Sequence, residues 1–435
     1  MNSRDNLPDL VCRCLSAGEW IILLLASPLF LFPQIELAPV LLLFPLLWLA
    51  RRRTQGHYIP RTPVDWPILG LLGATLVSLW VTPDLVLSYR KIAGLLYGMA
   101  LFYALVNWAR RQPTLLLPTL LALVLGFGAA LLGLLGTNWT AKFPIVQALS
   151  AHVPQLISGV TDAESGFNPN HVAGALIMYL PLQAALLSEL AWQGITSPAR
   201  RRGLIWGLAL LLTFTAAVVL LTQSRVAWAA LALGLAGLGA IRLPRWRPFL
   251  LAGIVLIATL VLAVGPVGLG DWLVAQGFMN TSGETSWEAR VELWSRALWA
   301  ITDFPLTGVG MNAFRQVVWY LYPLFQFPAG KDIGHAHNAY LQTALDLGLP
   351  GLICYLALLG GTLAAGWRTY RRSRCPLTRL AALGGTVGLI VNGLWGLTDA
   401  IALGAKHGFL WWAMLALVIA AALRYESEAS EEKPA

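Results

Sequence analysis

Apolar runs of about 20 residues, the length that a helix needs to cross a bilayer, recur along almost the whole chain. Hydrophobic residues make up 57% of the 435 residues and charged residues only 12%, against roughly 25% charged residues in soluble domains. The pattern predicts an all-α, polytopic membrane bundle with about 12 transmembrane helices. They are expected at residues 16–33, 35–50, 66–82, 91–108, 114–136, 171–191, 204–222, 226–241, 248–265, 338–365, 379–397 and 405–423.

Basic residues gather in every second loop between these runs. The clusters are Arg51–Arg53, Arg110–Arg111, Arg200–Arg202, Arg242–Arg247 and Arg368–Arg379. Cytoplasmic loops of membrane proteins carry this excess of Lys and Arg, so both termini are expected in the cytoplasm. The formal net charge of +9 is therefore a topology signal, and no nucleic-acid partner is expected. No cleavable signal peptide is expected either, because the first apolar run lacks a small-residue cleavage site.

The loop lengths divide the chain into four parts. Residues 1–265 are expected to form an N-terminal bundle of about nine spans, followed by a large outward loop at 266–336. C-terminal helices are expected over 337–425 and a disordered acidic tail over 426–435. Within the large loop, residues 286–301 show the spacing of an amphipathic helix, which would lie on the outer membrane surface or cap the bundle. Its apolar stripe is expected to contain Trp287, Val291, Trp294, Leu298 and Ile301.

The stretch from Gly334 to Gln342 concentrates chemistry where a polar loop meets an apolar run. It contains His335, His337, Asn338 and Tyr340. His335 and His337 are two of the six histidines of the chain. Histidine is well suited to moving protons near neutral pH, and a titratable group at the mouth of a membrane segment is a candidate functional residue. The alternative is that these histidines only form hydrogen bonds with water or backbone at the interface.

Nine basic residues fall on the outer side, where topology disfavours them. They are Arg90, Lys91, Lys142, Arg225, Arg290, Arg296, Arg315, Lys331 and Lys406. Arg225 is the most informative, because a charge in a turn between two apolar spans is expensive. For Arg296 and Arg315, loop solvation or local ion pairing is the alternative. A cationic pocket formed with His337 would suit a lipid-linked phosphate or pyrophosphate.

A second polar motif precedes the run at 171–191. Asn170, in the Asn168-Pro169-Asn170 turn, is a candidate helix cap or a candidate ligand for sugar hydroxyls, and His171 fits a structural or a functional role. The sequence has no phosphate-binding loop of the nucleotide-hydrolase type and no clear metal-ligand spacing on the outer face. No cofactor and no metal are therefore expected.

Several motifs occur in an order that resembles one family. They are residues 167–174, 221–225, Arg290 with Trp294 leading to 304–310, 335–342 and 347–352. Together they resemble the O-antigen ligase and polymerase superfamily of bacterial envelope glycosyltransferases, over about residues 160–360. The resemblance implies a GT-C-like helical membrane enzyme with a helical periplasmic loop domain. Such an enzyme transfers a glycan from undecaprenyl-pyrophosphate to an acceptor without a nucleotide sugar or a metal.

The resemblance also assigns residues. The essential histidine of the family matches His337, expected to be the general base, and its essential arginines match Arg225 and Arg290, expected to stabilise the pyrophosphate. In-line attack then predicts inversion at the anomeric carbon. Further residues are expected to bind substrate: Arg90, Lys91, Asn168, Asn170, His335, Asn338, Tyr340 and Lys406.

Several functions remain open at this point. A single dominant late outer loop favours a ligase that joins O-antigen to lipid A core at the periplasmic face of the bacterial inner membrane. The alternatives are a repeat-unit polymerase, with a second carrier-linked glycan as acceptor, and a protein O-oligosaccharyltransferase. The alternative from a different class is an anion (bicarbonate-like) transporter. Some members of the superfamily are described as inorganic-carbon transporters, and residues 398–406 resemble that branch. A transporter, however, usually shows repeat symmetry with a midplane site, and neither is evident.

Overall fold

The computed structural model describes residues 7–139, 152–157, 166–188, 197–243, 245, 247–250, 287–328, 330–401 and 403–431, with six scattered residues between 252 and 263. The elements of these regions are all helices. They are α1 (Leu7–Leu25), α2 (Ser27–Leu31), η1 (Ile35–Leu42), α3 (Leu43–Gln55), α4 (Asp65–Val81), α5 (Leu85–Arg110), α6 (Leu116–Gly136), α8 (Pro169–Leu176), α9 (Tyr179–Leu186), α10 (Pro198–Leu221), α11 (Arg225–Arg242), α13 (Trp287–Asp303), α14 (Phe314–Leu321), α15 (Ala339–Arg372), α16 (Pro376–Trp395) and α17 (Gly408–Glu431).

The predicted fold class, an all-α polytopic membrane bundle, is confirmed. Within the described regions, 7 helices are long and apolar enough to cross a membrane, namely α5, α6, α10, α11, α15, α16 and α17. The helix α4 is apolar but shorter. The expected total of about 12 spans stays a prediction, and most of the run at 248–265 lies outside the described residues.

Several of the expected spans are broken in the structure, and the runs at 171–191 and 35–50 each contain a proline near the break. The run at 171–191 forms two short helices, α8 and α9, separated at Ile177 and Met178. Pro181 explains the break, because it has no N–H to bond the carbonyl of Ile177 and its ring clashes with that carbonyl. The run at 35–50 starts as the 3₁₀ helix η1, which contains Pro39, before α3 continues it.

The acidic tail differs from the expectation of disorder. The helix α17 continues to Glu431, so residues 426–431 are helical, whereas 432–435 lie outside the described residues. Arg424 and Glu428 form an ion pair one helical turn apart, at 3.2 Å, on this extension. Such a pair supports an exposed helix end.

Glycines allow the central helices to approach one another closely. A Cβ at Gly98 of α5 would lie 2.1 Å from the ring of Trp412 on α17, and one at Gly388 of α16 would lie 2.1 Å from the carbonyl oxygen of Met178. Small residues at such crossings are the usual means of packing helices within lipid. The buried core therefore runs between α5, α17, α15 and α16.

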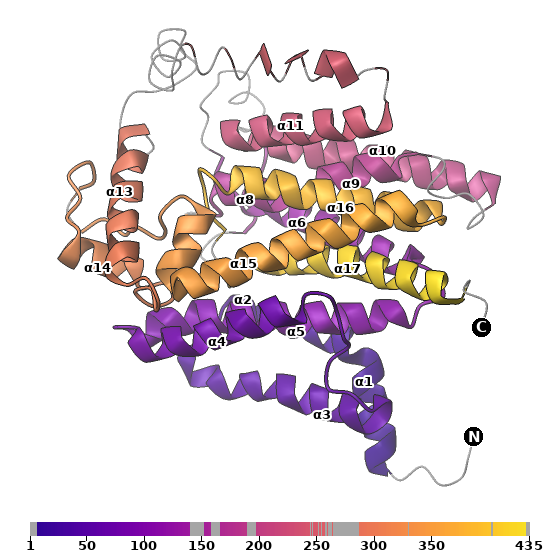
Figure 1. Cartoon of the computed structure of the whole chain (residues 1–435), viewed down its shortest axis with the longest axis horizontal. Helices are drawn as coiled ribbons and strands as arrows, with labels where there is room; N and C mark the ends of the chain where they lie inside the picture. The colour runs from indigo at the N-terminus through magenta and orange to yellow at the C-terminus, as the bar shows by residue number, and fades with distance from the viewer. Residues whose placement is uncertain are drawn as a thin grey trace.

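The long helices run side by side across Figure 1, and α13 and α14 lie across one end of them. Both chain termini lie toward the opposite end. The helix α13 packs against α15, with Ala289, Leu293 and Ala297 on its buried face. Val291 and Leu298, which the spacing placed on the apolar stripe, are exposed at 44% and 52%, so the inward face is rotated from the one expected.

Candidate functional site

Three segments meet at the end of the bundle where α13 lies. They are the start of α8, the loop that leads into α15, and the connection between α16 and α17. These segments contribute His171, His335 with His337, and Asp399 with His407, respectively. Their side chains form one connected cluster of four histidines and a carboxylate.

The start of α15 is tied to the end of α16. The side-chain oxygen of Asn338 caps α15 by accepting hydrogen bonds from the N–H groups of Tyr340 and Leu341, each at 3.0 Å. Its amide nitrogen donates to the carbonyl of Leu397 at 2.8 Å, and the N–H of Ala339 donates to the carbonyl of Gly396 at 2.7 Å. The loop before α15 and the connection after α16 are therefore held together by backbone and side-chain bonds.

His337 and Asp399 face each other across this junction. Nδ1 of His337 lies 3.3 Å from Oδ1 of Asp399, which also accepts a hydrogen bond from the N–H of Ala400 at 2.9 Å. Burial is the largest single effect on Asp399 and opposes its ionisation. The hydrogen bond from His337 and the charges of the three nearby histidines together outweigh burial and hold the pKa of Asp399 below its ordinary value. The His337 side chain is 33% exposed and that of Asp399 only 5%, so the imidazole is the accessible member of the pair.

The other histidines complete the cluster around His337 and Asp399. Nε2 of His335 lies 3.1 Å from Nε2 of His171, and Nδ1 of His335 accepts a hydrogen bond from the backbone N–H of His337, also at 3.1 Å. The ring of His407 lies 5.1 Å from that of His171, centre to centre. Burial lowers the pKa of both His335 and His407 well below the ordinary value, so both are neutral at pH 7.

Lys91 of α5 adds positive potential to this cluster. Its charge acts on His335, His407 and His171. Close packing brings it there, because Gly404 adopts a left-handed φ of 78° and a Cβ at that position would lie 1.8 Å from the carbonyl oxygen of Lys91. Glycine at 404 thus lets the α16–α17 connection lie directly on α5.

The two predicted catalytic arginines lie near each other. Arg225 begins α11 after a turn in which Gln223 has a φ of 52°, and the charges of Arg225 and Arg290 are close enough to repel each other. Arg290 stands one helical turn before Trp294 on α13, so the two side chains share a face. The indole N–H of Trp294 donates to the carbonyl of His337 at 3.4 Å. The helix α13 thus joins the arginine pair to the histidine loop.

The remaining predicted site residues have structural contacts of their own. Asn168, and not Asn170, caps α8, because its side chain accepts from the N–H of Asn170 at 2.9 Å. The hydroxyl of Tyr340 donates to the carbonyl of Gly393 on α16 at 2.9 Å. Lys406 lies over the ring of Phe32 at 4.3 Å, and the charge of Arg90 acts on Asp84 at the start of α5.

Sequence reasoning missed the role of Asp399 and of His407. Each lies in the short connection between α16 and α17, where no motif of regular spacing marks them. One signal was available: Asp399 is among the few acidic residues at the end of an apolar run, and such residues are usually functional.

The donor atoms of His171, His335 and Asp399 lie within 4.8 Å of one another and are the group that a metal ion would use. The hydrogen bonding of His335 does not suit a metal. A neutral imidazole that accepts at Nδ1 carries its proton on Nε2, the nitrogen that faces His171. A histidine ligand instead donates from its second nitrogen.

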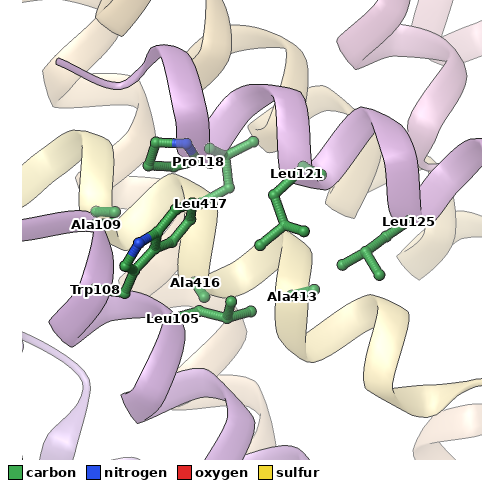
Figure 2. Close-up of a pocket in the computed structure, with 11 residues that line it drawn as sticks. Leu105, Trp108, Ala109, Pro118, Leu121, Leu125, Ala413, Ala416 and Leu417 are labelled. Carbon is green, nitrogen blue, oxygen red and sulfur yellow. The ribbon is translucent and has the colours of Figure 1, made fainter. Parts of the chain in front are cut away.

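An apolar pocket between α5, α6 and α17 is separate from this site (Figure 2). Trp108, Pro118 and Leu417 line it, near the end of α5 away from Lys91. A second apolar cavity lies just beneath the site, between α15, α16 and α17. Tyr355, Trp395 and Trp411 are among its lining residues, and Ala339 at the start of α15 is another.

Comparison with known proteins identifies one part of the chain. Residues 195–356 match the family model described as O-antigen ligase. The match covers α10, α11, α13, α14 and the first half of α15, and thus Arg225, Arg290 and His337. The match supports the resemblance to the O-antigen ligase and polymerase superfamily that the sequence motifs predicted. It also supports the interpretation of the protein as a membrane glycosyltransferase of that type. The comparison with curated proteins gives no match.

Proposed function

We propose that this protein is an inverting, metal-independent glycosyltransferase. It moves a glycan from undecaprenyl-pyrophosphate to a sugar hydroxyl, and the favoured reaction is ligation of O-antigen to lipid A core. The observation that carries the proposal is the His337–Asp399 pair, which lies beside the helix that carries Arg290. The O-antigen ligase match over the same region supports it.

The pair defines which nitrogen of His337 acts. Because Asp399 is ionised, Nδ1 of His337 carries the proton and donates it to the carboxylate at 3.3 Å. The lone pair of Nε2 is then free to accept the proton of an incoming hydroxyl. A buried carboxylate that orients a histidine base in this way also stabilises the imidazolium that forms.

The arginines suit the leaving group. When the anomeric C–O bond breaks, its electron pair goes to the pyrophosphate, which gains negative charge. Arg225 and Arg290 repel each other in the free protein, so an anion placed between them relieves that repulsion. Fixed donors of this kind contribute most where charge develops during the reaction.

The reaction then balances in a single displacement. The acceptor oxygen forms a bond to the anomeric carbon as its proton moves to Nε2 of His337, and the carrier pyrophosphate leaves from the opposite face. The configuration at the anomeric carbon is inverted. No step requires a metal or a nucleotide.

The charge pattern supports one membrane orientation. The excess of Lys and Arg in every second loop favours cytoplasmic termini, and the site lies at the end of the bundle away from the termini. In a bacterial inner membrane the site would therefore face the periplasm.

The test is a transfer assay with purified protein in detergent. Labelled undecaprenyl-pyrophosphate glycan is the donor, EDTA is present, and lipid A core competes with a second carrier-linked repeat unit as acceptor. Label on lipid A core is the expected result, and a ladder on the carrier would make the protein a polymerase. A serine-containing peptide is offered in a separate reaction, where label on the peptide would indicate protein glycosylation.

His337→Ala is the control, and it should reduce transfer by about 10²- to 10⁴-fold, the usual contribution of a general base. Full transfer by this variant would contradict the proposed mechanism. An intact donor with every acceptor would contradict the function, and bicarbonate flux into liposomes would then be measured.

A further inference from the structure

His337 has an unusual backbone. Its φ is 46°, in the left-handed region that residues with a side chain rarely adopt. Residues held in such conformations cluster at functional sites and persist only where their surroundings fix them. The backbone N–H of His337 has one such restraint, the hydrogen bond to Nδ1 of His335 at 3.1 Å.

This bond fixes the tautomer of His335. Because Nδ1 accepts, the proton of the neutral ring must sit on Nε2, which lies 3.1 Å from Nε2 of His171. Nε2 of His171 must then be the acceptor. The hydrogen bonds therefore run in one direction, from the N–H of His337 through the ring of His335 to His171. These three residues are called the histidine chain below.

The far end of the histidine chain lies in a closely packed part of the bundle. His171 lies in the first turn of α8, whose Gly174 carbonyl accepts a hydrogen bond from the buried side chain of Asn392 on α16 at 2.9 Å. A Cβ at Gly174 would lie 2.5 Å from the ring of Trp395, so α8 and α16 are in close contact there. The chain thus links the backbone of His337 to a packed part of the bundle.

We infer that His335 is a positioning residue for His337, a role distinct from the substrate-binding role that the sequence suggested. Nδ1 of His335 holds the left-handed backbone of His337, and its Nε2–H fixes the ring against His171. In that conformation the His337 side chain points Nδ1 at Asp399 and leaves Nε2 for the acceptor. The inference rests on the proposed function, because it concerns the presentation of the proposed base.

Two substitutions distinguish the contribution of Nδ1 of His335 from that of Nε2. The side-chain oxygen of asparagine can occupy the place of Nδ1, so His335→Asn keeps an acceptor for the N–H of His337. The longer side chain of glutamine reaches the place of Nε2, so His335→Gln keeps the contact with His171 and loses that acceptor. Both variants are neutral, polar and similar in size, which makes them matched controls for each other.

We expect His335→Gln to lower kcat by about 10²-fold with little change in KM for donor and acceptor, since the base is misplaced while substrate binding is kept. The kcat of His335→Asn should be at least tenfold higher than that of His335→Gln. His152→Gln, in an exposed outer segment, controls for a general effect of replacing a histidine. Equal loss in both His335 variants, or a loss that falls on KM, would overturn the inference.

A second measurement is independent of activity. In protein labelled with ¹⁵N-histidine, the His335 signals can be assigned by their absence in His335→Asn. The inference requires a protonated Nε2 in His335 and a protonated Nδ1 in His171 at pH 7. The opposite tautomer of His335 would refute it even in an active protein. If wild-type protein transfers no glycan, the proposed function fails, whereas the tautomer still decides the positioning role.

Discussion

Nδ1 of His337 and Oδ1 of Asp399 lie 3.3 Å apart, although the two residues are separated by 62 positions and belong to different connections of the bundle. One precedes α15 and the other joins α16 to α17. The pair selects the tautomer in which Nε2 of His337 is free, and it gives the site a buried negative charge among cationic and titratable groups.

Replacing Asp399 by Asn removes this charge and leaves the shape of the side chain nearly unchanged. We expect kcat for glycan transfer to fall by about 10- to 100-fold, because His337 loses the partner that fixes its tautomer and stabilises its protonated form. Steady-state kinetics with saturating donor would measure this. Asp332→Asn, at an exposed residue paired with Arg315, should change kcat little. Equal effects of the two substitutions would argue against the pair.

Replacing Arg225 or Arg290 by Lys keeps the charge but loses the planar pair of N–H donors that matches phosphate oxygens. Each substitution should lower kcat by about 10²- to 10³-fold, the usual effect of removing one donor to a developing anion. Arg296→Lys is the matched control on α13, since Arg296 pairs with Glu292 and lies over Trp299. Transfer rates that stay near wild type in both arginine variants would remove them from the mechanism.

Replacing Gly404 by Ala should destabilise the fold around the site. The left-handed φ of 78° alone costs an alanine about 1–2 kcal/mol, and its Cβ would also strike the carbonyl oxygen of Lys91. We expect a lower Tm and reduced transfer, measured on the same detergent-purified sample. Gly73→Ala places a Cβ in open space on α4 and should leave Tm unchanged or slightly higher. A Gly404→Ala protein as stable as wild type would disprove this packing.

Stability should depend on pH below neutrality. Burial holds the pKa of His335 and of His407 below the value of about 6.5 that they have in the unfolded chain. The unfolded chain therefore binds more protons than the folded protein as pH falls below 6.5. Stability is fully present above that pH and is lost progressively below it, by up to about 1.4 kcal/mol per pH unit for each histidine.

Thermal unfolding between pH 8 and pH 5 would measure this dependence. His407→Gln cannot be protonated in this range, so it should show a shallower decline than wild type. A Tm that is constant over the range, or that rises on acidification, would contradict the buried neutral state of these rings.

The sequence was sufficient for the fold class because apolar run length reports helices directly in a membrane protein. It was less reliable for helix breaks, since Pro181 divides one expected span and no local signal showed that the neighbouring helices would accept the break. The inward face of α13 was also misplaced. Small residues such as Ala289 and Ala297 face α15, and hydrophobicity alone favours the larger Val291 and Leu298.

The residues of the candidate site could be predicted from the sequence only in part. His335 and His337 were singled out because they share one motif, and the arginines because they oppose the topology rule; their roles stay predictions. Asp399 joins His337 through the folding of two separate connections, which no spacing encodes. Asn338 and Tyr340 belong to the motif too, but the structure uses their polar atoms to join α15 to α16.

The bonds from Asn338 to Leu397 and from Ala339 to Gly396 have a mechanical consequence. We expect these bonds to keep His337 and Asp399 in one stiff unit while substrate enters and leaves. The helix α13 carries Arg290 and reaches this unit through Trp294. We therefore expect any opening of the site to come from a movement of α13 that leaves His337 paired with Asp399.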